Sequence, residues 1–287
     1  MPYAYVTVDG LKGTGALNVT STAMDERLRI LIEAVSQEFD RYANRQFQPL
    51  VGTRYFSGGG GIKLFVPDVI SVSSLKEDTN KDGTFETTWA AADYDLWPYN
   101  AEPTTEYGRP YTSIVVSDKS TGTQDEFLVG RRNYEIVGTW GYRSVTLDAG
   151  RATTAVTTDA TATAVALNGS ATGFIGIGMT LLIDSEYMYV RNIGSGAGTS
   201  ITVTRGVNGS TGATHTATAA ISRFVYPSQL VEDSFIQAAR LWKRREASFA
   251  STVGFIDTGQ MMTWKGIDDD VKLMLAPFRK IALGVGV

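Results

Sequence analysis

The sequence has no cysteine and a single histidine, His215, among its 287 residues. Without cysteine there is no disulfide, no thiolate zinc site and no cysteine nucleophile. One histidine cannot build a multi-histidine metal centre, and nothing near His215 suggests a Ser-His-Asp triad. We expect it to have a packing or surface role. The sequence therefore predicts a protein that is not an enzyme and has no metal site or cofactor.

Long apolar runs and a strong charge of one sign are also missing. The chain is 43% hydrophobic and 20% charged, which suits an ordinary packed core and not a disordered chain. Its net charge of -4 argues against a sequence-specific reader of DNA. No stretch approaches the roughly 18 apolar residues that span a bilayer, and no signal peptide is visible at the amino end. We expect no association with membranes.

The composition changes twice along the chain. Residues 150–225 are dominated by Thr, Ala and Gly and carry little charge, whereas the segments on either side hold most of the charged side chains. Such a shift is typical of a separate module. The sequence thus predicts a discontinuous body, residues 1–149 and 226–287, that carries an inserted β-domain at 150–225.

Helical periodicity is present at both ends of the chain. Apolar residues spaced by three and four predict helices over 22–44, from Ser228 to about 250, and from about 267 onward. Pro277 is expected to bend the last helix. The apolar face of the first helix comprises Leu28, Leu31, Ile32, Val35, Phe39 and Tyr42.

Between the helices, short β-rich runs alternate with Gly, Pro and Asp-Gly breaks. The runs before residue 150 predict a small antiparallel sheet, and those after it predict a compact barrel or sandwich. The expected fold class is α+β: a helical body with a small antiparallel β-sheet, plus an inserted all-β barrel or sandwich domain. The expected strands are 53–56, 62–66, 69–72, 74–77, 94–97, 113–116, 134–140, 164–167, 180–183, 187–191 and 200–205.

The stretch from Asp78 to Glu86 begins like a calcium-binding loop, with Asp78, Asn80 and Asp82 alternating before Gly83. The residue at the position of the usual bidentate carboxylate is Trp89, however, and the flanks read as strands. A hairpin turn closed by Asp82-Gly83 fits better, although the sequence leaves a weak calcium site at Asp78–Asp82 open. Aromatic residues of this half could line a sugar groove or cover a subunit interface, and we favour the interface: Trp89, Trp97, Tyr99, Tyr107 and Tyr111.

The order of the elements resembles a known family. The matching motifs are residues 39–49 (Phe-Asp-Arg-Tyr-Ala-Asn-Arg-Gln-Phe-Gln-Pro), 53–56 (Thr-Arg-Tyr-Phe), 64–76 (Leu-Phe-Val-Pro-Asp-Val-Ile-Ser-Val-Ser-Ser-Leu-Lys), 82–86 (Asp-Gly-Thr-Phe-Glu), 93–98 (Asp-Tyr-Asp-Leu-Trp-Pro), 138–142 (Gly-Thr-Trp-Gly-Tyr), 238–245 (Ala-Ala-Arg-Leu-Trp-Lys-Arg-Arg) and 271–280 (Val-Lys-Leu-Met-Leu-Ala-Pro-Phe-Arg-Lys). This series resembles the head–tail connector (adaptor) proteins of tailed bacteriophages. The likeness covers about 1–149 and 226–287, and the middle segment departs from the family's pattern.

The resemblance implies a structural virion protein in the neck, at the head–tail interface, that is assembled in the host cytoplasm. It implies a homo-oligomeric ring, a dodecamer, between the portal protein and a tail-side stopper or tail protein. Double-stranded DNA would pass through the lumen during ejection without sequence-specific contacts. The insert departs from the family's pattern, and its near-zero charge and few aromatic anchors lead us to expect that it contacts neighbouring subunits or the capsid shell. The alternative is a receptor- or polysaccharide-binding virion protein that uses the inserted β-domain.

The segment 250–266 is apolar without clear periodicity, which is typical of an arm that is ordered by its partner. We therefore expect the closing part of the chain to bind the portal. The expected portal-docking residues are Phe255, Met261, Met262, Trp264 and Phe278.

Overall fold

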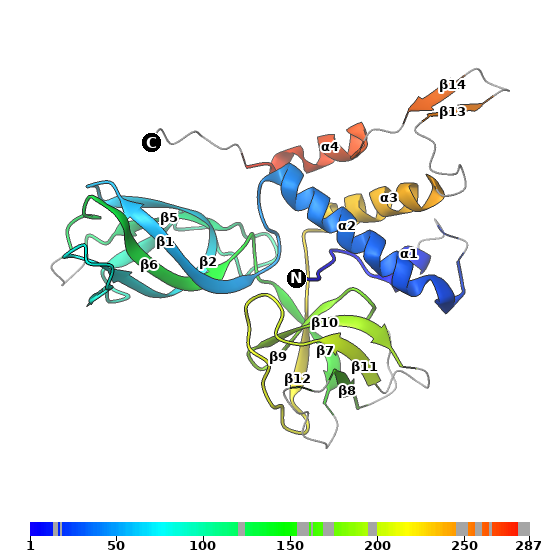
Figure 1. Cartoon of the computed structure of the whole chain (residues 1–287), viewed down its shortest axis with the longest axis horizontal. Coiled ribbons are helices and arrows are strands. Elements are labelled where there is room, and N and C mark those ends of the chain that lie inside the picture. The colour runs from blue at the N-terminus through cyan, green and yellow to red at the C-terminus, as the bar shows by residue number, and fades with distance from the viewer. Residues whose placement is uncertain are drawn as a thin grey trace. The chain divides into compact units, whose positions relative to one another are not determined.

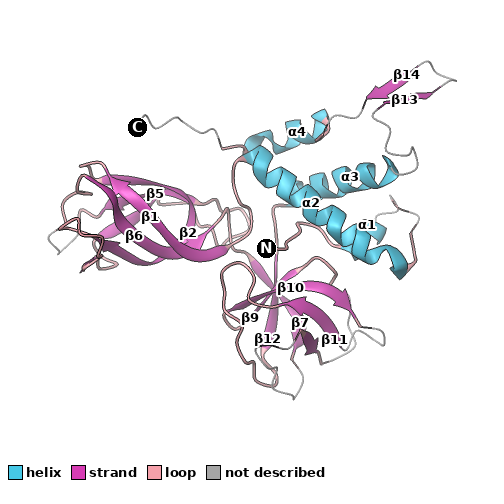
Figure 2. Ribbon diagram, in the orientation of Figure 1, coloured by secondary structure: helices cyan, strands magenta, loops and turns pink. Residues whose placement is uncertain are grey.

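The protein folds mainly into β-strands (Figures 1 and 2). In the computed structural model the described residues are 1–13, 17, 19–119, 124–153, 161, 163–168, 175–194, 200–244, 252–255, 260–263 and 266–280. Over these residues the chain forms two six-stranded antiparallel sheets, a two-stranded hairpin and four α-helices.

The expected fold class is wrong, because the protein is not a helical body with a small sheet. The first sheet is as large as the second, and its strands β1, β2, β5 and β6 are longer than predicted. Pro67 was expected to end a strand, but β2 runs without interruption from Lys63 to Glu77. The pairing with β5 shifts register between Phe65 and Val69, and a proline can be accommodated at such an irregularity because its missing N–H is not needed in the ladder.

The chain divides into two compact units, which we treat separately. The helix–barrel unit comprises Met1–Asn44, Thr146–Val207 and Thr211–Val287, and the sheet unit comprises Arg45–Val145 and Asn208–Ser210. The expected boundaries of an inserted module at 150–225 stay a prediction, because contacts within one chain do not show which segment folds alone.

The sheet unit has the strand order β1-β6-β2-β5-β4, with β3 paired to β2. Its strands are β1 (Leu50–Gly58), β2 (Lys63–Glu77), β3 (Thr87–Thr88), β4 (Tyr94–Trp97), β5 (Tyr111–Val116) and β6 (Gly130–Trp140). The large buried aromatic residues Trp89, Phe127, Tyr134 and Trp140 pack with aliphatic side chains in one hydrophobic core. This packing places Trp89 in the core, so it cannot contribute to an exposed aromatic surface.

The helix–barrel unit contains the second sheet, in the order β7-β12-β9-β10-β11-β8. Its strands are β7 (Thr146–Ala152), β8 (Ala164–Ala166), β9 (Thr180–Ile183), β10 (Glu186–Ile193), β11 (Ser200–Thr204) and β12 (Ala220–Phe224). A bridge between Thr153 and Leu167 joins the β7 end of the sheet to the β8 end. The sheet therefore closes into a barrel, whose interior is filled by aliphatic side chains such as Leu181, Met188 and Ile201.

The helices of this unit confirm most of the helical predictions. They are α1 (Val8–Gly13), α2 (Asp25–Ala43), α3 (Ser228–Arg244) and α4 (Asp269–Leu275), with 3-10 turns η1 (Thr22–Met24) and η4 (Ala276–Phe278). Asn44 ends α2 in the left-handed conformation, and Pro277 replaces the end of the last helix by a 3-10 turn. α1 was not predicted, and residues 245–250 lie outside the described residues. None of the described helices is long and apolar enough to span a membrane.

The amino-terminal helices pack directly on the barrel. The Val8 N–H donates to the Ile177 carbonyl at 2.9 Å, and the Ile177 N–H donates to the Asp9 carboxylate at 3.2 Å. A Cβ at Gly178 would lie only 2.8 Å from the Cδ1 atom of Ile32, so the absence of a side chain at this position allows α2 to approach closely.

Candidate functional site

A buried polar site is centred on Glu186, which is fully buried at the start of β10. Its carboxylate accepts hydrogen bonds from five donors. Arg205 donates through Nε at 2.7 Å and Nη2 at 2.6 Å, and the backbone N–H groups of Gly206 and Ala213 each donate at 3.0 Å. The fifth contact is His215 Nε2 at 2.8 Å. These hydrogen bonds connect the loop after β11, which contains Arg205, Gly206 and Ala213, to Glu186 on strand β10 of the barrel.

Electrostatics in this network favour the ionised carboxylate. Burial alone would raise the pKa of Glu186, but the hydrogen bonds from Arg205, the backbone and His215 outweigh it and hold the pKa at about 2. The other ring nitrogen of His215 lies 2.7 Å from Asp184. The single histidine thus has the packing role that the sequence suggested. Its two carboxylate partners were not predicted, since they are about thirty residues away in the chain.

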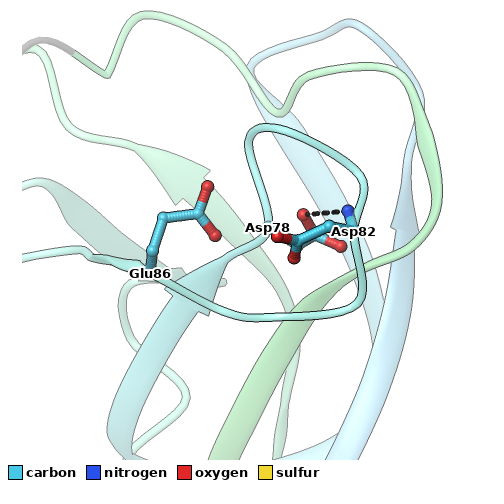
Figure 3. A group of neighbouring side chains, drawn as sticks. All are labelled: Asp78, Asp82 and Glu86. Carbon is cyan, nitrogen blue, oxygen red and sulfur yellow. Dashed lines mark hydrogen bonds between the residues drawn. The ribbon is translucent and has the colours of Figure 1, made fainter.

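A second group of acidic side chains lies in the loop between β2 and β3 (Figure 3). One oxygen from each of Asp78, Asp82 and Glu86 lies within 4.8 Å of the others, and this is the only such group of potential metal ligands over the described residues. Asp78 Oδ1 accepts from the N–H groups of Lys81 and Asp82, and its Oδ2 accepts from Gly83.

These contacts are those of a turn that closes on its own backbone. Calcium binds oxygen ligands, and the three carboxylates of this loop lie close enough to one another to hold one ion. The position expected for a further carboxylate is Trp89, whose indole N–H donates to Glu77 in the core. The hairpin turn that the sequence favoured accounts for these backbone contacts, because Gly83, with φ of +92°, allows the sharp turn. A calcium site at this loop stays a prediction to be tested.

An exposed aromatic surface lies on the sheet unit. Phe65, Ser113 and Trp97 are paired side by side across β2, β5 and β4, so their side chains share one face. Phe65 is 69% exposed and Trp97 is 40% exposed. The Lys63 ammonium lies 5.2 Å from the centre of each ring. Tyr99 packs edge-on against Trp97.

This surface, which we call the aromatic face (Lys63, Phe65, Trp97 and Tyr99), contains two of the aromatic residues expected at an interface, Trp97 and Tyr99. It adds Phe65, which sequence reasoning missed, and the interface itself stays a prediction. Strand alternation is the signal that could have identified it, since Phe65 lies between the buried residues Leu64 and Val66. Aromatic side chains exposed in this way are common at protein contacts.

The expected portal-docking residues lie at the end of the chain. Phe255 is in β13 (Thr252–Phe255), and Met261 and Met262 are in β14 (Gln260–Thr263). These strands pair as a hairpin, which the sequence analysis did not predict. Phe278 is half-buried in η4, and Trp264 lies outside the described residues. The structure therefore places three of the five residues on one hairpin.

Across the described part of the chain, no nucleophile is paired with the histidine, because both ring nitrogens face carboxylates.

A scan against profiles of protein families and a search of curated proteins both found no match.

Proposed function

We propose that this protein is a structural virion component, a head–tail connector that assembles into a ring between the portal and the tail. Twelve-fold assembly, a tail-side stopper as neighbour and passage of double-stranded DNA through the lumen follow from the resemblance. The proposal includes no catalytic step and no cofactor.

The observation that carries the proposal is the ordered series of motifs on consecutive elements. The motif at 39–49 spans the end of α2, its left-handed cap at Asn44 and the approach to β1. The Pro-Asp step lies within β2. Trp140 is the last residue of β6, and the N–H of the next residue, Gly141, donates to the Asp68 carbonyl. The described part of the motif at 238–245 lies on α3, and the motif at 271–280 begins on α4 and continues through η4. The series supports the proposal because several motifs resemble the family's motifs and also occur in the same order along the chain.

The barrel supports the structural function over the alternative of polysaccharide binding. Sugar sites usually stack pyranose rings on exposed aromatic side chains. The barrel aromatics Tyr187, Tyr189 and Phe224 are all buried, and Phe174 lies outside the described residues. The barrel surface thus offers no described aromatic ring for stacking.

The test is electron microscopy of the purified protein, alone and mixed with the portal protein of the same virus. We expect rings on the portal in the mixture, whether or not the protein alone is monomeric. Absence of any complex with the portal at micromolar concentrations of both would overturn the proposal. Binding of the full chain to a host polysaccharide on a glycan array would support the alternative.

A further inference from the structure

Helix α3 holds the last helix through a row of polar side chains. The Gln229 amide donates to the Met274 carbonyl, and the Gln237 amide donates to the Gly266 carbonyl at 3.2 Å. Arg240 binds Asp268 at 2.9 Å and Asp270 at 2.7 Å. These residues are spaced by eight and three positions, so they share one face of α3. That face is where α4 packs.

Asp233 lies in the middle of this row, four residues from Gln229 and four from Gln237. It is completely buried, and neither carboxylate oxygen has a hydrogen-bond partner among the described residues. The other members of the row each bind the closing segment, which we define as residues 266–280. A buried carboxylate without a donor is rare, because an ionised oxygen that loses water must normally gain a hydrogen bond.

The charges around Asp233 are unfavourable to its ionisation. Glu232 is its neighbour on α3, and Asp270 reaches it from α4. Asp270 itself remains ionised because the hydrogen bond from Arg240 lowers its pKa to about 2. α1 and α2 also pack against α3, and on α2 the Glu38 carboxylate lies beside Gly266 of the closing segment. The charged groups that raise the pKa of Asp233 are Glu232 and Asp270.

We propose that Asp233 is a proton-dependent latch: α4 packs on α3 when this carboxyl is protonated, and the closing segment is released when it ionises. Release gives the carboxylate water, which is the donor that the docked state lacks. α4 has only seven residues, and only Val271 and Leu275 are fully buried. A short helix with so small an apolar contact can be displaced by one unfavourable charge.

The direction of the pH dependence follows from the proton balance. Burial, together with Glu232 and Asp270, raises the pKa of Asp233 from 3.8 to about 6 in the docked state. The docked state binds the proton more tightly, so docking is strongest at acidic pH and weakens as the pH rises from about 4 through 6. The ratio of released to docked molecules should rise about tenfold between pH 5 and pH 8.

The latch does not depend on the proposed neck function. Its connection to portal binding does depend on that function, because the closing segment carries Phe278, one of the proposed portal contacts. At neutral pH the segment would exchange between docked and released states, and a partner could capture the released state without first unfolding the protein.

The test uses the absence of cysteine from the chain. In the full-length Leu275→Cys variant, the only thiol lies on the buried side of α4. Its reaction with a thiol reagent therefore reports release of the closing segment. At each pH the rate is divided by that of the urea-unfolded protein, which removes the effect of thiol ionisation. The control is Ile183→Cys, whose thiol is buried in the barrel.

We expect the relative accessibility of Cys at 275 to increase about tenfold from pH 5 to pH 8, while that at 183 stays constant. Adding Asp233→Asn should abolish the increase, and adding Glu232→Gln should leave most of it. A flat profile at 275 with Asp233 intact would overturn the latch, and this measurement needs no change at Asp233 itself. An unchanged increase in the Asp233→Asn variant would overturn it as well. Because no portal is present, failure here leaves the connector proposal to its own test.

Discussion

Two buried carboxylates in the same unit show how hydrogen bonding decides what burial costs. Glu186 accepts from five donors and has a strongly lowered pKa, whereas Asp233 accepts from none of the described groups and has a raised one. The difference does not come from the amount of burial, since both are fully buried. It comes from the donors that the neighbouring loops supply, which are Arg205, two backbone N–H groups and His215 for Glu186.

His215 should be important for the barrel's stability. Replacing it by Ala removes a donor from the buried Glu186, and we expect the free energy of unfolding to fall by about 2–3 kcal/mol. Asp184→Asn is the matched control, because Asp184 is exposed, and Asn keeps the acceptor and tolerates the left-handed backbone at that position. The control should cost less than about 1 kcal/mol. Urea denaturation measures the unfolding free energy of both variants. Equal losses would contradict the claim that the contact of His215 with Glu186 matters more than its contact with Asp184.

Glu186 should also make the barrel sensitive to acid. Its pKa is lowered from 4.5 to about 2 on folding, so its stabilising effect is fully present above pH 4.5 and is lost as the pH falls toward 2. We expect Glu186→Gln to destabilise the protein at pH 7 and to lessen the further loss between pH 4.5 and 2. Thermal unfolding across this range measures both effects. If the stability of the wild type and of the Glu186→Gln variant fell in parallel with pH, other carboxylates would control the acid response.

At the scale of elements, the close approach of α2 to the barrel depends on Gly178. This residue has φ of +99°, and a Cβ there would lie 2.8 Å from Ile32 Cδ1 and 2.9 Å from the Val6 carbonyl oxygen. Gly178→Ala should therefore destabilise the helix–barrel unit by about 1–3 kcal/mol through strain and overpacking. The control is Gly13→Ala, where nothing lies within 4 Å. Denaturant unfolding should separate the two variants, and similar values would refute the close-packing argument.

The acidic loop of the sheet unit gives another element-scale prediction. Asp78 holds three backbone N–H groups of the turn, whereas Asp82 holds only that of Thr84. We expect Asp78→Ala to cost about 1–3 kcal/mol and Asp82→Ala less than about 1 kcal/mol. Hydrogen exchange of the turn and of the adjoining ends of β2 and β3 would report the loss locally. Comparable exchange in both variants would mean that Asp78 does not organise the turn.

At the scale of the whole molecule, the connector proposal predicts that the closing hairpin is a binding element. Replacing residues 251–265 by a short Gly/Ser linker removes β13 and β14 but leaves α3 and α4 in the chain. We expect portal binding to be lost, while the circular dichroism and unfolding of the remaining protein stay close to those of the wild type. Portal affinity that survives this deletion would show that the docking residues lie elsewhere.

Local features of the fold could be predicted from the sequence, because they depend on neighbours a few residues apart. The apolar spacing of Leu28, Ile32 and Val35 predicts one face of α2, and all three are buried. β9 and β4 have the bounds that alternation and turn residues predict. The absence of disulfides and of thiolate metal ligands likewise follows from composition alone, since the chain has no cysteine.

Only the tertiary structure decided the balance of helix and sheet, and the partners of the buried charges. The continuity of β2 through Pro67 depends on β5 and β6, whose strands lie more than forty residues further along the chain. The barrel closes through Thr153 and Leu167, and Glu186 receives donors from loops about twenty to thirty residues away. Periodicity shows which face of an element is apolar, but not which distant element covers it. Pairing and burial between distant segments arise only when the whole chain packs. For the same reason, Glu186 receives hydrogen-bond donors from distant loops, whereas Asp233 receives none from the described groups.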